Sequence, residues 1–398
     1  MELCSEQKVI LEKVAKENGF KNYTIKSERA SNTGDNFVGV LNRISIEENA
    51  RKIAVIIKST KSGVEKEIQN PRIPFLREIY VYDQIFPTYA KFAQEFNIKD
   101  VFKAHCKCFG TCDEENKEYL VLEDMREHGF KMCSKYETMN SFHVEAVIRE
   151  YAKFHSLALA MNTKRPEQFI KLTKGIFKDV PQQHRDDVQK IQMLNLYNAV
   201  KGDQLATDVV KKFENQLNEA IATDTNDDVV IIHGDTWCNN MLFKYEDINN
   251  QEKPAEVCII DWQISQLGSP ANDLVNFLFY NGSEKILDDY EKYLKIYYET
   301  LRNNLKEFSC DAEEILPFER LRKMFKNYCG RSLWNCVLIM RLQMCESHEV
   351  PDIKNIKSLM ENGATMEDLV NFKIRRIDEY YRRLGVIIKF MIKNSLFK

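Results

Sequence analysis

The stretch His233-Gly234-Asp235-Thr236-Trp237-Cys238-Asn239-Asn240 follows directly on the apolar run at 229–232. The apolar run predicts a buried β-strand, so the polar residues stand at the point where that strand ends. A second apolar run, at 257–260, ends in the same way in Asp261-Trp262-Gln263, and the polar segment 245–255 separates the two runs. We therefore expect the runs to be adjacent strands of one hairpin, which brings their polar ends together.

The first loop has the spacing H-x-D-x-x-x-x-N, from His233 to Asn240, which is also the spacing of the phosphoryl-transfer loop in protein kinases. In this chemistry Asp235 accepts the proton of an attacking hydroxyl, and Asn240 points its amide oxygen at Mg²⁺. Gly234 lets the backbone turn tightly beside the aspartate. Asp261 would supply a second Mg²⁺ ligand, because Mg²⁺ binds one or two carboxylates together with phosphate oxygens. The alternative is a buried strand end whose polar residues only cap turns, but the two motifs together favour a kinase-type site.

The residues after Asp261 indicate the kind of substrate. Ser269 followed by Pro270 is typical of a helix start, and only residues 262–268 separate this start from Asp261. This spacing leaves no room for a long phosphorylatable segment, so a small molecule is favoured over a protein as the substrate. Asp273, in the first turn of the helix, would either bond back to the catalytic loop or stabilise the helix dipole.

A lysine suited to nucleotide phosphates ends the strand predicted at 53–57. Lys58 stands there as the lysine does in the V-A-I-K motif. Its acidic partner is predicted to be Glu78, which lies in a helical segment beside apolar residues. Glu65 and Glu67 are alternatives in a more polar stretch, and a solvated lysine at a strand end is the structural alternative.

Two further segments are predicted to contact the nucleotide. A polar loop before the strand at 37–46 suits phosphate contacts through backbone N–H and hydroxyl groups, with a generic turn as the alternative. The segment Tyr119–Met125 resembles a hinge between lobes, whose backbone near Glu123 and Met125 would bond to adenine. The residues of the polar loop that we assign to the phosphates are Ser31, Asn32, Thr33, Gly34 and Asn36.

The periodicity of the apolar residues predicts an α+β protein with a small sheet-rich lobe followed by a larger helical lobe. The family resemblance given below implies a two-lobed, protein-kinase-like fold. We therefore divide the chain into a small β-rich N-lobe that binds nucleotide, residues 1–124, and a larger helical C-lobe for catalysis and acceptor binding, residues 125–398. Strands are predicted at 37–46, 53–57, 101–109 and 119–122, and helices at 9–16, from Phe75 onward, and at 141–163, 205–222, 284–306, 318–344 and 366–393.

The composition excludes several classes of protein. The 398 residues include 57 Lys and Arg against 60 Asp and Glu, so a net charge of −3 gives no reason to expect nucleic acid or an anionic membrane as a partner. Eleven irregularly spaced cysteines do not suggest a disulfide scaffold. The first turns of the chain lack the apolar core of a signal peptide, and no apolar run approaches the roughly 20 residues of a membrane span. We expect a cytoplasmic protein without an obligate protein partner.

Taken together, the motifs resemble the insect ecdysteroid kinase-like (CHK kinase-like) family, which is related to choline and aminoglycoside kinases. The resemblance covers about residues 30–345. Its specific parts are His233-Gly234-Asp235-x-Trp237-x-x-Asn240-x-x-Phe243 and Ile260-Asp261-Trp262-Gln263…Gly268-Ser269-Pro270…Asp273-Leu274, and it also includes Gly34-Asp35-Asn36-Phe37, Phe75-x-x-Glu78-x-x-x-Tyr82 and Leu122-Glu123-Asp124-Met125.

The resemblance implies phosphorylation of small-molecule hydroxyls with ATP and Mg²⁺. By motif position it implies Asp235 as the base, Asn240 and Asp261 as the metal ligands, and Lys58 with Glu78 as the phosphate clamp. Members of the family are associated with ecdysteroid phosphorylation or with detoxification of xenobiotics, and the motifs do not separate these two roles.

The acceptor pocket is predicted to lie along the apolar stretch 329–342, with Trp334 as an aromatic wall. Tyr297, on another helix downstream of Asp261, is a second candidate. The stretch 329–342 has no carboxylate to meet a polycationic sugar, so an apolar acceptor is favoured, such as a steroid, a phenol or a glycoside of one. The structural alternative is that Trp334 fills the core. Two other functions stay open, a protein kinase and a non-catalytic nucleotide- or steroid-binding module on the same fold.

Overall fold

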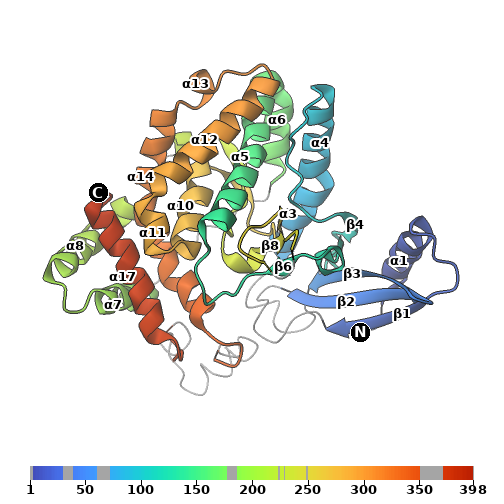
Figure 1. The fold of residues 1–398 in the computed structure, drawn as a ribbon, viewed down its shortest axis with the longest axis horizontal. Helices are drawn as coiled ribbons and strands as arrows, with labels where there is room; N and C mark the ends of the chain where they lie inside the picture. Colours follow the sequence, from blue (N-terminus) through green and yellow to red (C-terminus); the bar gives the residue numbers. More distant parts are fainter. Residues whose placement is uncertain are drawn as a thin grey trace.

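A five-stranded antiparallel sheet forms most of the first lobe (Figure 1), with the strand order β1-β2-β3-β5-β4. Asn49, with a φ of 54°, takes the left-handed position in the two-residue turn between β2 and β3. The computed structural model describes residues 3–29, 39–60, 72–176, 186–222, 225–227, 229–247, 250–349 and 371–397. The strands are β1 (Thr24–Arg29), β2 (Gly39–Glu48), β3 (Arg51–Thr60), β4 (Cys108–Cys112) and β5 (Tyr119–Glu123).

The two faces of this sheet bury different helices. On one face, α1 (Ser5–Glu17) inserts Leu11 and Val14 between residues such as Val55 and Val121, which alternate along their strands toward that face. On the other face, Leu120 and Leu122 join the main core of the protein together with α3 (Arg72–Tyr80). Lys58 follows Ile57 and therefore points to the α3 face.

The helix α3 links the sheet to the second lobe. It continues through the π-helical turn η1 (Val81–Ile85) into α4 (Phe86–Glu95), which packs against α5 (Ser141–Lys164) of the second lobe. Figure 1 shows α4 beside α5 and α6 at the upper right of the helical lobe, above the sheet. One apolar core thus runs from the underside of the sheet into the helices.

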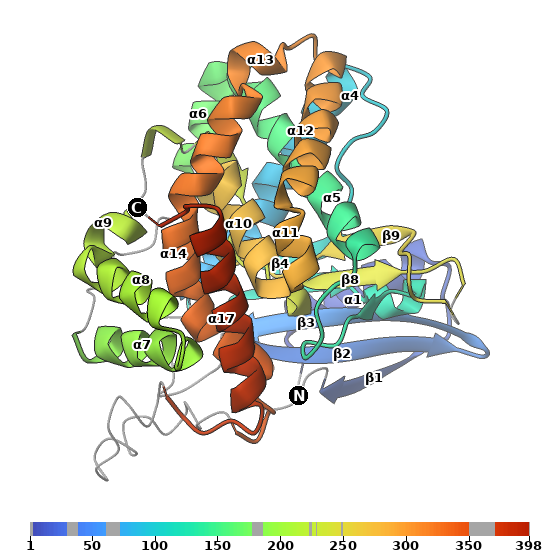
Figure 2. The same cartoon turned by 60° about the vertical axis from the view of Figure 1, so that its left-hand side comes forward.

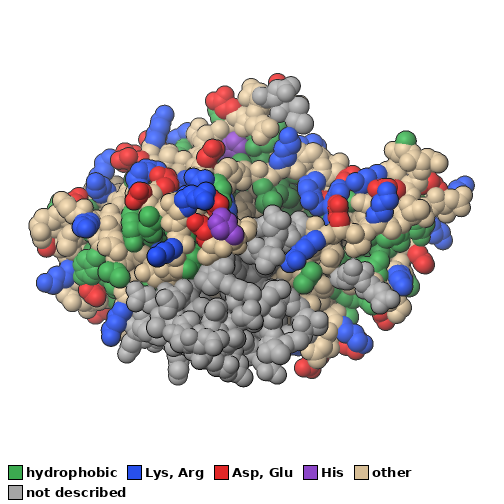
Figure 3. Space-filling view, turned by 90° about the horizontal axis from the view of Figure 1, so that it is seen from below, with side chains coloured by type: hydrophobic (Ala, Val, Ile, Leu, Met, Phe, Trp, Pro, Cys, Tyr) green, Lys and Arg blue, Asp and Glu red, His purple; other side chains and the backbone are tan. Residues whose placement is uncertain are grey.

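Helices make up most of the second lobe (Figure 2), and the strongest contacts are between α5 and α12 and between α10 and α14. On the face drawn in Figure 3, acidic and basic side chains are interspersed over the described parts. Among the described residues, no helix has the length and apolar character to cross a membrane. The remaining helices are α6 (Pro166–Lys174), α7 (Asp186–Ala199), α8 (Gln204–Asn215), α9 (Leu217–Ile221), α10 (Pro270–Asn281), α11 (Glu284–Asp288), α12 (Tyr290–Glu307), α13 (Ala312–Ile315), α14 (Phe318–Met344) and α17 (Ile377–Lys393), with short 3-10 turns η2 (Met125–His128), η3 (Thr225–Asp227) and η4 (Cys238–Asn240).

Two small sheets lie between the lobes and carry the polar loops. One pairs β7 (Val230–Ile232) with β10 (Gln266–Gly268), and the other has the order β6-β8-β9, from β6 (Lys131–Met132), β8 (Met241–Lys244) and β9 (Glu256–Ile259). The prediction that the runs at 229–232 and 257–260 pair in one hairpin is therefore wrong. The hairpin is formed by β8 and β9, because the four residues directly after Asn240 are themselves a strand, which was not among the predicted strands.

The predicted two-lobed α+β fold is confirmed, and the helix at 318–344 has the bounds expected from its apolar spacing. Four predicted elements need correction. The strand predicted at 101–109 begins only at Cys108; Phe102, Ala104 and Cys106 alternate as buried residues, but their extended segment lies outside the five-stranded ladder. The helices predicted at 205–222 and 284–306 are each two helices, and the last helix begins at Ile377. The boundary between residues 124 and 125 stays a prediction.

Candidate active site

The loop after β7 holds Asp235 and Asn240 against each other. Asn240 Nδ2 donates to Asp235 Oδ2 at 2.8 Å and to the Asp235 carbonyl at 3.0 Å. Gly234 has a φ of 86°, and a Cβ at this position would lie 2.9 Å from the carbonyl oxygen of Ile264. The tight turn predicted at Gly234 is therefore present, and both the backbone angle and the available space require glycine there.

The carboxylate of Asp273 fixes the start of this loop. It accepts the backbone N–H groups of His233 and Gly234, each at 2.8 Å, and it is fully buried in the first turn of α10, whose N-cap is Ser269. His155 of α5 lies 3.2 Å from the same carboxylate. Of the two roles considered for Asp273, the bond back to the catalytic loop is the one that the structure contains.

A chain of charged groups joins the lobes. Lys58 Nζ lies 2.6 Å from Glu78 Oε2 and 2.5 Å from Asp261 Oδ1. The predicted pairing of Lys58 with Glu78 is thus confirmed, whereas Glu65 and Glu67 lie outside the described residues. Asp261 has a φ of 64°, in the left-handed region that aspartate tolerates better than most residues. Asp261 lies two residues after Ile259, the last residue of β9.

Two neighbouring residues of α3 hold the segment around Asp261, and sequence reasoning missed one of them. Arg77, which is completely buried, donates to the carbonyl oxygen of Gln263 at 3.0 Å. Glu78 acts on this segment through Lys58, whose ammonium group lies between Glu78 Oε2 and Asp261 Oδ1. An arginine beside a buried glutamate in an otherwise apolar helix was the available signal, because such a residue is buried only where it finds partners.

The charges around Lys58 are unbalanced. Three carboxyl groups, Glu78, Asp261 and Asp235, surround one ammonium group, and burial together with the charge of Asp261 raises the pKa of Asp235 to about 7. Burial alone would lower the pKa of Lys58, but Asp261 and Glu78 outweigh it and raise this pKa. The excess of negative charge favours a cation beside Asp235 and Asp261.

The donor set at this point fits Mg²⁺ held together with phosphate oxygens. Asn240 donates from its Nδ2 to Asp235, and no described residue donates to its Oδ1. The Asp261 side chain is 22% exposed, and its second oxygen meets only Gln263 Nε2, at 3.3 Å. Oxygen ligands from one carboxylate and one amide are what Mg²⁺ takes from a protein when phosphates supply other positions.

On the C-lobe side of Asp235, the structure places polar groups that sequence reasoning missed. Burial, together with Cys336 and Asp235, raises the pKa of Tyr280 in α10, and the side chain of Asn335 hydrogen-bonds to this tyrosine. Tyr280 lies on α10 and Asn335 on α14, and the charge of Asp235 acts on the pKa of Tyr280. We had considered the stretch 329–342 only as the apolar wall of an acceptor pocket, and its polar residue Asn335 was overlooked.

The remaining predicted site residues fall into three groups. The phosphate loop, with Ser31, Asn32, Thr33, Gly34 and Asn36, lies outside the described residues. Glu123 ends β5, and Met125 begins the 3-10 turn η2, so the segment lies where the sheet passes into the second lobe. Their contact with adenine stays a prediction.

The two candidates for the acceptor pocket are buried. Trp334 is 8% exposed and belongs to the main core. Tyr297 is fully buried, and its hydroxyl lies 2.9 Å from His155 Nδ1, on the far side of the imidazole from Asp273. Tyr297 therefore supports the buried histidine and does not line an acceptor pocket, which corrects its assignment.

Comparison with known proteins identifies a family. Residues 33–310 match the family model described as the ecdysteroid kinase-like family. No curated protein matches the chain. The matched range contains Lys58, Glu78, Asp235, Asn240 and Asp261, but not α14.

Proposed function

Because the chain belongs to the ecdysteroid kinase-like family, which implies kinase-type phosphotransfer to a small molecule, we propose that it transfers the terminal phosphoryl group of ATP to a hydroxyl group in a Mg²⁺-dependent reaction. The observation that carries this proposal is the continuous chain of contacts from Glu78 through Lys58 to Asp261. It joins the sheet, α3 and the end of β9 at one point, as phosphotransfer requires of the groups that hold a nucleotide.

Each residue of the group has a role in this proposal. Asp235 accepts the proton of the acceptor hydroxyl. Asn240 keeps the carboxylate of Asp235 in place through the 2.8 Å hydrogen bond. Lys58 faces the phosphates, and Glu78 holds the ammonium group. Asn240 Oδ1 and Asp261 would hold Mg²⁺, which when bound with ATP neutralises the charge on the phosphates.

The segment after Asp261 supports a small molecule as the acceptor. Residues 266–268 form β10, which pairs with β7, and α10 begins at Pro270. The last three residues of the connection, 266–268, therefore belong to the sheet that carries the catalytic loop. A protein kinase would need a longer segment here to receive a peptide.

The direct test is a screen for phosphorylated products. The protein is incubated with ATP and Mg²⁺ and with ecdysteroids, phenols or glycosides, and products are detected by mass spectrometry as an added phosphate. Asp261→Asn serves as the control for phosphate from contaminating enzymes. Tight nucleotide binding without any acceptor-dependent or Mg²⁺-dependent turnover would instead support a non-catalytic binding module.

The ion pair of Lys58 and Glu78 gives a prediction about coupling. Lys58→Met should raise KM for ATP and lower kcat, because the ammonium group stabilises charge on the transferred group. Glu78→Gln should have a smaller effect in the same direction. Since the two side chains are in contact, the double variant should lose less activity than the sum of the single losses in free energy, by about 0.5–3 kcal/mol. Strictly additive losses in steady-state kinetics would contradict the role of Glu78 as the residue that holds Lys58.

We further propose a largely apolar acceptor, steroid-like or phenolic. The support is that α14 offers no carboxylate from Cys329 to Leu342, while Tyr280 and Asn335 provide neutral polar groups on α10 and α14. Neutral polar groups beside an apolar wall suit a hydroxyl on a hydrophobic skeleton.

The burial of Trp334 leads to a prediction that tests whether this side chain lines the acceptor pocket or fills the core. Trp334→Ala should destabilise the protein by about 3–5 kcal/mol, because truncating a buried tryptophan leaves a cavity. The activity that survives at low temperature should fall equally for an apolar and a cationic acceptor. Leu338→Ala, at an exposed position of the same helix, is the matched control for stability. A rise in KM for the apolar acceptor alone, with an unchanged melting temperature, would show that Trp334 is a pocket wall after all.

A further inference from the structure

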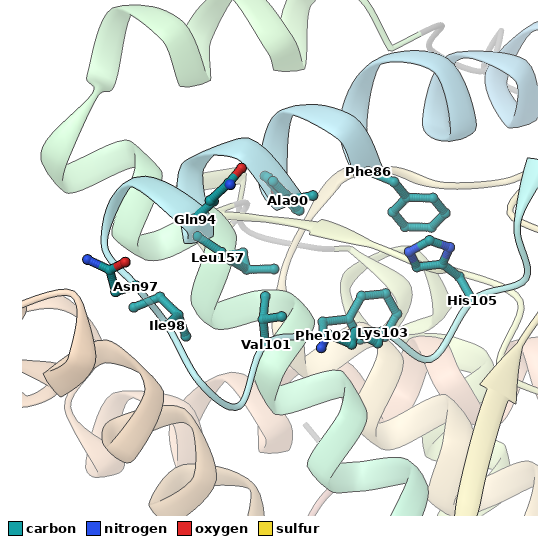
Figure 4. A pocket seen from close by; sticks show the side chains of 12 residues that line it. Phe86, Ala90, Gln94, Asn97, Ile98, Val101, Phe102, Lys103, His105 and Leu157 are labelled. Carbon is teal, nitrogen blue, oxygen red and sulfur yellow. The ribbon is translucent and has the colours of Figure 1, made fainter.

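A cavity of about 550 Å³ opens between α4, the segment 96–105 and α5 (Figure 4). None of its lining residues belongs to the catalytic group around Asp235. The nearest link is through two rings: Phe86 lines the cavity and makes an edge-on contact with Trp262, at 5.0 Å between centroids. The volume is in the range of sites for small organic ligands.

The walls of this cavity suit a flat ring. The imidazole of His105 stacks on Phe86, with 4.0 Å between centroids and 9° between planes, and Phe102 lies at the same end. On the α4 side, Ala90 and Ala93 line the cavity without filling it. Aromatic faces beside small residues leave a slot into which another aromatic ring can stack.

The polar side chains that line the cavity are neutral or basic, and they are Tyr89, Gln94, Asn97, Lys103 and His105. The hydroxyl of Tyr89 is buried, and within the described ranges it has no hydrogen-bond partner. Leaving such a group unpaired is unfavourable, and a ligand that accepts this hydrogen bond would satisfy the hydroxyl. Lys103 is exposed at the rim and pairs with no carboxylate of the described chain, and no acidic residue lines the cavity.

We propose that this cavity is a second ligand site, separate from the catalytic cleft, which binds a small planar aromatic carboxylate. The ring lies against Phe86, His105 and Phe102, and the carboxylate accepts from the Tyr89 hydroxyl and meets the charge of Lys103. His105 is held for this stacking by its Nδ1, which lies 3.0 Å from the carbonyl oxygen of Cys106. A cationic ligand is disfavoured, because its charge would face Lys103 without any acid nearby.

The probe for the test is 2-naphthoate, with 2-naphthylmethanol as its neutral counterpart, titrated by fluorescence and by calorimetry. The unmodified protein should bind the carboxylate at least fivefold more tightly than the alcohol. Tyr89→Phe and Lys103→Met should each weaken naphthoate binding about fivefold to tenfold, since each removes one hydrogen bond to a charged acceptor. The melting temperature of ligand-free Tyr89→Phe should not fall, because the lost hydroxyl had no partner.

A blocking variant ties the binding to this cavity. Ala90→Trp places a large ring in the slot and should abolish binding, whereas Lys91→Trp, at an exposed position next to it on α4, should leave binding unchanged. Naphthoate binding that survives Ala90→Trp would place the ligand elsewhere and overturn the proposal. Equal affinity for the carboxylate and the alcohol, or no binding of either, would overturn the ligand class. None of these results depends on phosphotransfer activity.

Discussion

Asp261→Asn is expected to lower phosphotransfer by about 10²–10³-fold or more, because it removes the charge that would hold Mg²⁺ against the phosphates. Asparagine is the better substitution than alanine here. With a φ of 64°, alanine would add backbone strain of about 1–2 kcal/mol, which asparagine largely avoids. The loss should therefore appear in kcat at saturating ATP and Mg²⁺, while the melting temperature stays within a few degrees of the original.

The matched control for Asp261→Asn is Glu256→Gln, on the same strand β9. Glu256 is exposed and pairs with Lys244, so losing its charge removes one carboxylate without touching the group around Lys58. Its activity should stay within about twofold, since exposed ion pairs contribute at most about 1 kcal/mol. Near-normal turnover by Asp261→Asn at saturating Mg²⁺-ATP would show that this carboxylate is not the metal ligand.

The sequence predicted the structure best where a motif of reactive side chains or a clear apolar periodicity lies within one short stretch of chain. The loop from His233 to Asn240 follows a buried strand, and the apolar spacing of 318–344 gave both ends of α14. The pairing of Lys58 with Glu78 could also be predicted, because a buried lysine needs an acid and the helix after the strand supplies one. These features depend on short stretches of chain and on strong preferences of single residues.

Other parts depend on contacts between distant segments, which no local pattern reveals. Asp261 is 203 residues from Lys58 along the chain, and their contact follows from how the two lobes dock. The prediction of strand pairing failed for the same reason. The strand β7 could pair with any nearby sheet edge, and the three residues of β10 were too few to give a periodic signal. Arg77 was missed although its place beside Glu78 was a signal, because the backbone carbonyl of Gln263 to which it donates lies 186 residues away in the chain.

Asp235→Asn is expected to lower kcat by about 10²–10⁴-fold, the usual contribution of a general base, and at the same time to stabilise the protein. The carboxyl group is buried near Asp261, and its pKa is raised to about 7 from the usual 3.8. The folded state therefore binds this proton more tightly than the unfolded state does, so the original protein loses stability as the pH rises from about 4 to about 7. Asparagine keeps the shape and removes the charge.

The difference in unfolding free energy between Asp235→Asn and the original protein should accordingly grow across that pH range. It should reach about 1–3 kcal/mol near pH 8 and stay constant above it, measured by denaturant unfolding without nucleotide and with a chelator present. Asp208→Asn, at an exposed position on α8, should show no such pH-dependent gain. Loss of activity together with loss of stability would indicate that Asp235 holds the loop together. Gain of stability together with loss of activity is the result expected of a base whose burial the fold tolerates for the sake of the reaction.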